Sequence, residues 1–399
     1  MTDANQQVLG KEDSKIAVEE QYDYIITGAG CAGLSLVIHI IATGKLNDKK
    51  ILLLDQDAKI SNDRTWCFWE EKDGLFQSIV YKEWEQLQFK SPHYCKDLEI
   101  EPYTYKLIRG IDFYYYCLEQ IKQHSNICFK QGRVESIVSD EKETYVLVDK
   151  KKINGRYIFN SIVFQKPGLG RRHHWLLQHF RGWFIETAKE TFNPASATLM
   201  DFNTDQSKGT AFFYVLPFST TKALVEYTLF SPALLANVEY ETALKNYVEQ
   251  QLNIPAYSVY EKESGSIPMT NYPFSKFDNR IINIGTAGGQ TKGSSGYTFR
   301  FIQKHSARIA HSLAEKEFPV SGPSKNRFHF YDSILLYILS HNKMEGREIF
   351  KCLFSKNKAS SVLKFLDNET SLAEELSIIN SLPTMPFLKA AIRQTTGFI

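Results

Sequence analysis

Apolar and polar positions near the start of the chain fall into blocks, each with the length of one regular element. Tyr22 to Ile26 is a short, mostly apolar run that predicts a buried strand. Leu34 to Thr43 is long enough for a helix, and Ile51 to Leu54 predicts a second buried strand. This order predicts a strand–helix–strand unit, whose two strands lie parallel in one sheet.

A glycine-rich turn joins the first strand to the helix. Its three glycines have the spacing of a dinucleotide-binding turn, in which they permit a tight bend, close backbone approach to a pyrophosphate, and close packing of helix on strand. The helix N-terminus also offers free N–H groups to an anion. Flavoproteins hold FAD along their first such unit, so this early position favours FAD; a purely structural glycine turn is the alternative. The predicted contacts are Gly28, Ala29, Gly30, Cys31, Ala32 and Gly33.

Four further cofactor contacts are predicted outside this turn. Asp55 ends the second strand, 22 residues after Gly33, where its carboxylate can accept hydrogen bonds from a ribose. Arg64 begins a polar turn before an aromatic run and is expected near the flavin, although a hydrophobic anchor under a loop explains the run equally well. Val134 starts a strand of the kind that meets the adenine in FAD domains. Arg109, which precedes a predicted helix, is a fourth candidate contact.

A second glycine-rich segment follows a predicted strand, Arg280 to Gly285. A helix reaching about Leu313 is expected behind it. A strand in front and a helix behind favour a second cofactor-contacting turn over a mobile surface loop. The predicted contacts in this segment are Gly285, Gly288, Gly289 and Gly296.

The pattern changes beyond Leu176, where strand-like runs follow one another. These runs are Phe180–Ile185, Thr198–Phe202, Ala211–Leu216 and Ala223–Phe230. They predict an antiparallel sheet interrupted by a helix from Asn237 to Gln251. The tail from Phe328 to Ile399 is rich in Leu, Ile and Phe and predicts helices.

Length supports more than one domain, because 399 residues exceed the roughly 250–300 that one core usually serves. The predicted fold class is α/β with two domains: a Rossmann-like FAD-binding domain and an antiparallel-sheet substrate domain, followed by a C-terminal helical portion. Residues 1–20 are polar and are expected to be disordered. The FAD-binding domain is expected to be discontinuous, at 21–85, 105–165 and 275–320. The substrate domain is assigned to 86–104 and 166–274, and the helical portion to 321–399.

Composition narrows the class of function. A formal net charge of +2 gives no indication of nucleic-acid binding. The six cysteines stand singly, without metal-ligand spacing, and His173, His174 and His179 lack carboxylate or cysteine neighbours, so no metal site is predicted. Reduced thiols, the absence of a signal-peptide pattern and the absence of a long apolar run favour a cytoplasmic protein with no spanning helix.

Nearly the whole chain after residue 20 resembles the FAD-binding lycopene cyclases of carotenoid synthesis. The resemblance rests on several segments that occur in the family's order. They are Asp63–Trp69 (DRTWCFW), Leu177–Trp183, Met200–Phe202, Phe213–Phe218, Gly265–Thr270, Gly296–Phe299, Phe365–Asp367 and Pro386–Leu388. The family's catalytic Phe-Leu-Glu-Glu-Thr segment is matched by Leu224 to Thr228, so Glu226 takes the place of the first glutamate and Tyr227 replaces the second. Asn160 also departs from related flavoproteins, which often carry Asp at that point.

The resemblance implies cyclisation of lycopene to β-carotene through γ-carotene, with Glu226 as the catalytic acid. Reduced FAD is the implied cofactor, NAD(P)H the electron donor, and lycopene or other acyclic carotenoid end groups the substrates. Glu226 lies in an apolar run, and desolvation there would help it keep a proton. A substrate this apolar implies that the protein contacts a membrane surface peripherally. The Leu- and Phe-rich tail, including Phe387 and Leu388, is the best candidate for that contact.

Two rival functions share the same predicted fold, because fold alone does not fix function. The first is an FAD-dependent hydroxylase or reductase of an apolar substrate, which would consume NAD(P)H in proportion to product. The second is a non-enzymatic escort of prenylated proteins, which would not retain FAD. The residues do not determine the oligomeric state, nor do they distinguish β from ε rings or one ring from two.

Overall fold

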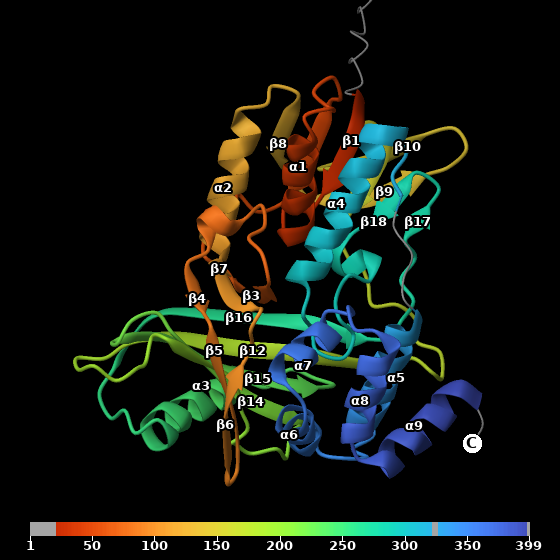
Figure 1. Cartoon of the computed structure of the whole chain (residues 1–399). Helices are drawn as coiled ribbons and strands as arrows, with labels where there is room; N and C mark the ends of the chain where they lie inside the picture. The colour runs from red at the N-terminus through yellow and green to blue at the C-terminus, as the bar shows by residue number, and fades with distance from the viewer. Residues whose placement is uncertain (1–20, 321–325, 397–399) are drawn as a thin grey trace, which may run out of the picture.

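The computed structural model describes residues 21–320 and 326–396, and its strands form three sheets (Figure 1). The parallel sheet and its helices form one half of the molecule. An antiparallel sheet crosses the middle, and the helical tail, in blue, packs beside it (Figure 1). The segment predicted to be disordered, residues 1–20, lies outside the described residues, as do residues 397–399 of the predicted helical tail.

The first sheet contains the predicted strand–helix–strand unit. Its strands are β1 (Gln21–Thr27), β2 (Ile51–Asp55), β8 (Ile127–Gln131), β9 (Val134–Ser139), β10 (Thr144–Val148), β11 (Lys151–Asn160), β17 (Phe277–Asp278) and β18 (Ile281–Asn283). The order is β17–β18–β11–β1–β2–β8, with β9 and β10 added beside β11. Strands β18, β11, β1, β2 and β8 run parallel. Ile51 to Leu54 are fully buried, as expected for a parallel strand covered on both faces.

Three helices pack along this sheet, side by side in Figure 1: α1 (Cys31–Thr43), α2 (Gly110–Lys122) and α4 (Phe299–Lys316). Their apolar side chains share one core with β1 and β2. Helix α1 begins at Cys31, three residues before its predicted start, because the glycine turn leads directly into the helix. Gly44 ends α1 in the left-handed conformation, which glycine adopts without steric cost.

The second sheet confirms the predicted antiparallel strands and adds others. Its strands are β5 (Gln86–Ser91), β6 (Tyr94–Glu99), β12 (Trp175–Glu186), β13 (Ser196–Asp201), β14 (Thr210–Pro217), β15 (Lys222–Ser231) and β16 (Ser258–Thr270). The order is β16–β12–β15–β14–β13–β5–β6, and only the β13–β5 pair is parallel. The polar strand β16 was not anticipated from the sequence.

The two faces of this sheet pack against different parts of the chain. On one face, Phe213, Val225 and Tyr227 share a core with helix α3 (Asn237–Asn246), which continues as a wider π-helical turn at Tyr247–Gln251. On the other face, Tyr214 and Leu224 belong to a core shared with the tail helices. Successive residues of a strand point to opposite faces, so each strand supplies both cores.

The remaining elements connect the two large sheets. A small antiparallel sheet consists of β3 (Thr65–Glu70), β4 (Lys82–Trp84) and β7 (Thr104–Arg109). Short 3₁₀ turns occur at Gln77–Ile79 and Gly285–Gly288. The tail consists of α5 (Asn326–Ser340), α6 (Gly346–Lys356), α7 (Ala359–Leu366), α8 (Leu372–Ser381) and α9 (Thr384–Thr396). None of the described helices is long and apolar enough to span a membrane.

Candidate active site

A cavity of about 390 Å³ lies where the glycine turn after β1 meets the antiparallel sheet. The parallel half of the molecule contributes residues of the glycine turn and of the second glycine segment, while β12, β14, β15 and β16 form the opposite wall. Its walls include Gly30, Cys31, Ala32, Arg64, Thr65, Cys67, Gln178, Tyr214, Glu226, Glu263, Gly285, Gly296 and Tyr297. The cavity therefore brings the predicted acid into the same space as several predicted cofactor contacts.

The glycine turn has the geometry of a phosphate-binding cradle. Gly28 has φ +95°, and a Cβ on Gly33 would lie 2.0 Å from the Gly28 carbonyl oxygen, so both positions require glycine. A Cβ on Gly30 would meet nothing within 4 Å. Helix α1 also begins without a side-chain cap, which leaves its first N–H groups available to an anion. These features fit the pyrophosphate of a dinucleotide.

Asp55 ends β2 and lies beside this turn. Its Oδ2 accepts a hydrogen bond from the Ala29 backbone N–H at 2.7 Å and lies 3.3 Å from Lys59 Nζ. Its Oδ1 accepts from the Asp57 N–H at 2.8 Å. These contacts fix the carboxylate at the end of β2, which is where a dinucleotide-binding fold places the ribose.

The other predicted cofactor contacts divide into two groups. Arg64, Gly285 and Gly296 line the cavity, whereas Arg109, Val134, Gly288 and Gly289 are absent from its described walls. Arg109 is paired with Asp112 at 2.6 Å, and Val134 packs in a core of the parallel sheet. Beside Gly296, Gln178 Oε1 is buried without a partner in the described residues, which fits a ligand that donates a hydrogen bond.

One row of residues across the antiparallel sheet places a second glutamate beside Glu226. The row consists of Tyr214 on β14, Glu226 on β15, Gly182 on β12 and Glu263 on β16, each paired with the next. Gly182 separates the two glutamates and has no side chain. A Cβ there would lie 2.7 Å from Leu224 Cδ1 and 3.0 Å from Glu263 Cγ. This glycine thus creates the space in which the two carboxyl groups meet.

Two threonines hold the carboxyl groups of this glutamate pair. Thr228 donates its hydroxyl hydrogen to Glu226 Oε1 at 2.7 Å, and Thr65 donates to Glu263 Oε2 at 2.6 Å. Glu263 is only 4% exposed, and its Oε1 has no other hydrogen-bond partner in the described residues. Glu226 is half-buried and lines the cavity. Glu263 was not identified from the sequence as a functional residue.

Burial raises the pKa of both glutamates. The pKa of Glu226 lies well above its ordinary value, first because of desolvation and then because of the nearby charge of Glu263. Desolvation also raises the pKa of Glu263 to about 7, while the hydrogen bond from Thr65 opposes this rise. Two such carboxyls do not ionise together at neutral pH. The pair therefore keeps at least one proton at neutral pH, and the rise in the pKa of Glu226 favours Glu226 as the group that carries it.

We expect Glu263→Gln to stabilise the fold at alkaline pH. The folded pKa of Glu263, about 7, lies above the ordinary value of 4.5, so folding favours the protonated form. Stability from this group is complete below about pH 4.5 and is lost as the pH rises through about 7, at a cost of at most about 3 kcal/mol. Calorimetry should show a higher Tm for the variant at about pH 9 and little difference at about pH 5. An equal Tm difference at both pH values would contradict this account.

Neutral aromatic and thiol groups complete the wall around Glu226. Tyr105, Tyr214, Tyr297 and Cys67 line the cavity, and burial raises the pKa of each. They are therefore uncharged at neutral pH. Aromatic rings can stabilise a cation through their π faces, so this wall suits a positively charged intermediate that must be kept from water.

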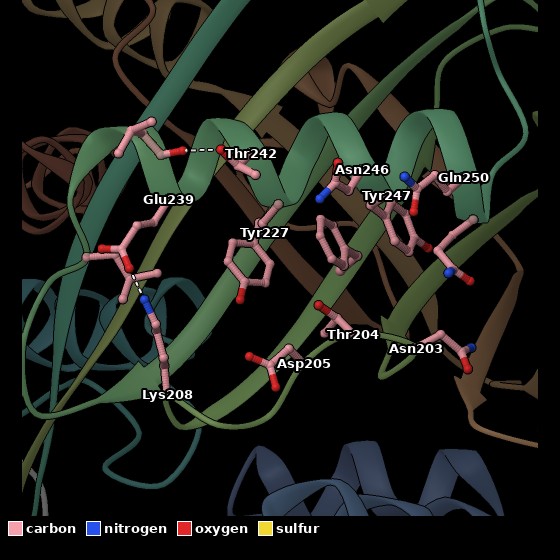
Figure 2. Close-up of a pocket in the computed structure, with 15 residues that line it drawn as sticks. Asn203, Thr204, Asp205, Lys208, Tyr227, Glu239, Thr242, Asn246, Tyr247 and Gln250 are labelled. Carbon is pink, nitrogen blue, oxygen red and sulfur yellow. Dashed lines mark hydrogen bonds and ion pairs between the residues drawn. The ribbon is translucent and has the colours of Figure 1, made fainter.

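Tyr227, which replaces the second glutamate of the family segment, faces away from Glu226. Consecutive residues of a strand point to opposite sides, and Tyr227 lies in the core on the α3 face. It lines a separate cavity of about 450 Å³. Figure 2 shows its ring between α3 and the loop that carries Thr204 and Asp205. A side chain at this position lies on the other side of the sheet from the active-site cavity.

The histidines have structural partners. His179 is fully buried, with Nε2 2.7 Å from Ser231 Oγ and Nδ1 2.6 Å from the Tyr240 hydroxyl. Within the described residues, no cluster of His, Cys, Asp and Glu has a geometry that would hold a metal ion.

Comparison with solved structures identifies the fold class. The chain is similar to a flavoprotein/dehydrogenase from Cytophaga hutchinsonii, with a TM-score of 0.65, 10% identity and coverage of 95% and 100% of the two chains. It is also similar to a geranylgeranyl bacteriochlorophyll reductase-like protein from Thermoplasma acidophilum, with a TM-score of 0.58, 11% identity and coverage of 94% and 97%. The predicted fold class, α/β with a Rossmann-like domain, is thus confirmed.

Comparison with protein families then identifies the particular family. The family model described as "Lycopene cyclase protein" matches residues 23–392, and the chain belongs to this family. A lycopene beta-cyclase of Pantoea ananas is 25% identical over 264 residues, which cover 63% of this chain and 64% of that protein. A chloroplastic neoxanthin synthase of Solanum tuberosum is 24% identical over 322 residues, covering 74% and 60%. The chain thus spans less than two thirds of the length of these relatives.

Proposed function

We propose that this chain is a lycopene β-cyclase, which closes the acyclic end groups of lycopene into β rings through γ-carotene to β-carotene. The observation that carries the proposal is the position of Glu226: a carboxyl group with a raised pKa that lines a cavity beside a dinucleotide-type turn. Membership of the lycopene cyclase family supports the choice of substrate. The reaction is an isomerisation, without net oxidation or reduction.

Cyclisation requires protonation of a carbon, ring closure through a carbocation, and loss of a proton. Glu226 donates the first proton, because its raised pKa keeps it protonated at neutral pH. Phe180, Leu216 and Leu224 form apolar parts of the wall and exclude water, which would otherwise trap the cation. The faces of Tyr214 and Tyr297 stabilise the positive charge while the ring forms.

FAD is the proposed cofactor of this cavity and the adjoining turn. The turn from Gly28 to Gly33 would hold its pyrophosphate, Asp55 its ribose, and Gly285 and Gly296 would lie against the ring system. The proposed FAD contacts also include Arg64, Arg109, Val134, Gly288 and Gly289. Reduced FAD, when bound, supplies negative electrostatic potential that opposes a developing positive charge. NAD(P)H is the proposed donor that keeps it reduced.

The function is tested by anaerobic incubation of the protein with lycopene, FAD and NADPH, with products separated by chromatography. We expect γ-carotene and then β-carotene to appear while NADPH consumption stays far below the amount of product. Oxygen-dependent products, or NADPH consumed in proportion to product, would instead indicate a hydroxylase or reductase. A purified protein that retains no flavin and leaves lycopene unchanged would support the escort function.

A membrane surface is the proposed source of so apolar a substrate. Helix α9 exposes Met385, Leu388 and Ile392, which lie three and four residues apart and therefore share one helix face. The exposed cations Lys389 and Arg393 flank this stripe and would attract anionic lipid headgroups. Phe387, which the sequence also suggested for this surface, packs instead against the core. We propose peripheral binding through α9 on the cytoplasmic side.

Flotation with liposomes that contain anionic lipid should carry the protein to the lipid layer. The double variant Leu388→Glu/Ile392→Glu should reduce the bound fraction at least tenfold, because burying one large apolar side chain contributes roughly 1.5–3 kcal/mol. Ile60→Glu is the matched control, since Ile60 is 82% exposed in a loop far from α9 in sequence. Equal flotation of the double variant and the control would contradict binding through α9.

A further inference from the structure

Glu263, the second member of the glutamate pair, takes no part in the first proton transfer of the proposed function. Glu263 is almost fully buried, and the hydroxyl of Thr65 holds one of its oxygens. Apart from the interaction with Glu226, its other oxygen has no hydrogen-bond partner in the described residues. Burying a carboxyl group in this way costs free energy, which favours a functional purpose for Glu263. The proposed reaction offers one, because each ring that forms takes up one proton and releases another.

We propose that Glu263 is the catalytic base that removes this second proton, and that the pair then restores itself by passing the proton from Glu263 to Glu226. The inference rests on the proposed cyclase function. The supporting geometry is the row in which Glu226 and Glu263 flank Gly182 and share one cavity wall.

The steps balance without an oxidant or reductant. Glu226 gives its proton to the CH carbon of the terminal double bond, which leaves a cation on the adjacent dimethyl carbon. The next suitable double bond along the chain attacks this carbon, a carbon–carbon bond closes the ring, and the charge moves to the methyl-bearing ring carbon. The Glu263 carboxylate removes the proton from the ring carbon that made the new bond. The electrons of that C–H bond form the β-ring double bond to the methyl-bearing carbon. Transfer of that proton to the Glu226 carboxylate regenerates the pair.

No other group around the pair is placed to serve as this base. Among the described residues that line the cavity, Glu226 and Glu263 are the only carboxyls. The titratable groups of neighbouring elements that interact electrostatically with Glu226 or Glu263 are Cys67, Tyr214, Tyr297, Asp63 and Glu261. Burial keeps the thiol and the phenols protonated. Asp63 is paired with Arg64 at 2.6 Å, and Glu261 accepts a hydrogen bond from Asn62 at 2.6 Å.

Gly182 is the positioning residue in this arrangement. Its missing side chain lets the two carboxyl groups approach across β12, whereas a Cβ would lie 3.0 Å from Glu263 Cγ and 3.3 Å from Oε1. Gly182→Ala therefore displaces Glu263 while both carboxyl groups are retained. The variant should lose the transfer of the proton from Glu263 back to Glu226, although it keeps both ionisable groups.

The test compares wild type, Glu263→Gln, Glu263→Asp and Gly182→Ala under anaerobic, reducing conditions with lycopene. Glu261→Gln is the matched control, since it makes the same change two residues along β16, outside the cavity walls. We expect Glu263→Gln to retain flavin and to slow β-ring formation about 10²–10⁴-fold. The surviving products should lose their proton from other carbons, as ε or exocyclic double bonds, or carry a hydroxyl from trapped water. Glu263→Asp should restore β rings in part, and Gly182→Ala should resemble Glu263→Gln.

The pH profile provides a readout that a purely structural role would not change. Glu263 must be ionised to accept a proton, so wild-type activity should fall as the pH drops below about 7. This acidic decline should be absent from the residual activity of Glu263→Gln. If wild type forms rings and Glu263→Gln keeps its rate, ring type and acidic decline, Glu263 is not the base, and the proposed cyclase function stands without it. If wild type forms no rings, both proposals fail. If calorimetry shows that Glu263→Gln is misfolded, the result for Glu263→Asp decides whether Glu263 is the base.

Discussion

Replacing Glu226 with glutamine is expected to leave FAD binding intact and to reduce cyclisation by about 10²–10⁴-fold or more. Glutamine has nearly the same size, and its Oε1 can still accept the hydrogen bond that Thr228 donates at 2.7 Å. What it lacks is a proton that can be transferred to carbon. The measurement is the rate of β-ring formation under reducing, oxygen-free conditions, so that the redox state of the flavin is the same in every sample.

Tyr227→Phe is the matched control for this experiment. It changes the next residue of the same strand, but Tyr227 points into the cavity on the α3 face, on the other side of the sheet from Glu226. Its cyclisation rate should stay within a few-fold of wild type. Glu226 and Glu263 are expected to act as a unit, so the double glutamine variant should be hardly slower than Glu226→Gln alone. Cyclisation by Glu226→Gln within a few-fold of wild type would show that Glu226 is not the acid.

The parallel half of the fold could be predicted from the sequence because its signals are local. The buried run Ile51 to Leu54, the spacing of the turn from Gly28 to Gly33, and the carboxylate of Asp55 each depend on neighbours in the chain. Glycine is required where φ is positive or a backbone atom comes close, and both conditions hold at Gly28 and Gly33. Local constraints of this kind are visible in a single sequence.

The glutamate pair could not be predicted in the same way, because its members meet only through sheet register. Glu226 and Glu263 are separated by β12, which lies between β15 and β16 in the sheet and precedes both in the chain. Strand β16 is rich in charged and small residues and lacks the apolar alternation that marks a half-buried strand. The one available signal was the i, i+2 spacing of Glu261 and Glu263, which puts them on one face of a strand.

The same reasoning explains the departure from the family segment at Tyr227. Two adjacent glutamates on a strand cannot both face one cavity, since successive side chains point to opposite sides of the sheet. The second carboxyl group of the cavity instead comes from Glu263 on β16. Replacement of the adjacent glutamate by tyrosine is therefore compatible with a carboxyl pair in the active site, a conclusion that required the three-dimensional arrangement.

The largest effect is expected from Gly30→Val, which should yield a folded but colourless protein without cyclase activity. Among the glycines of the first turn, Gly30 is the one that can be replaced without damage to the fold. Its φ is −85°, and a Cβ there meets no protein atom within 4 Å. By contrast, a Cβ on Gly33 would lie 2.0 Å from the Gly28 carbonyl oxygen, so that variant would confuse misfolding with cofactor loss. The valine methyl groups would occupy the space that the pyrophosphate needs.

Flavin bound to the purified Gly30→Val protein, measured by absorbance against protein concentration, provides the readout. Gly168→Val is the matched control, because Gly168 is exposed, has no protein atom within 4 Å of a Cβ, and lies outside the cavity walls. The control should keep its flavin and its activity and should unfold at nearly the wild-type temperature, since surface substitutions usually change stability by no more than about 0.5 kcal/mol. Gly30→Val should unfold at nearly the temperature of flavin-free wild type, because bound FAD stabilises only the folded protein that holds it. If folded Gly30→Val retains one FAD per chain, the pyrophosphate does not bind at this turn, and the assignment of the cofactor site to Gly28 through Gly33 is wrong.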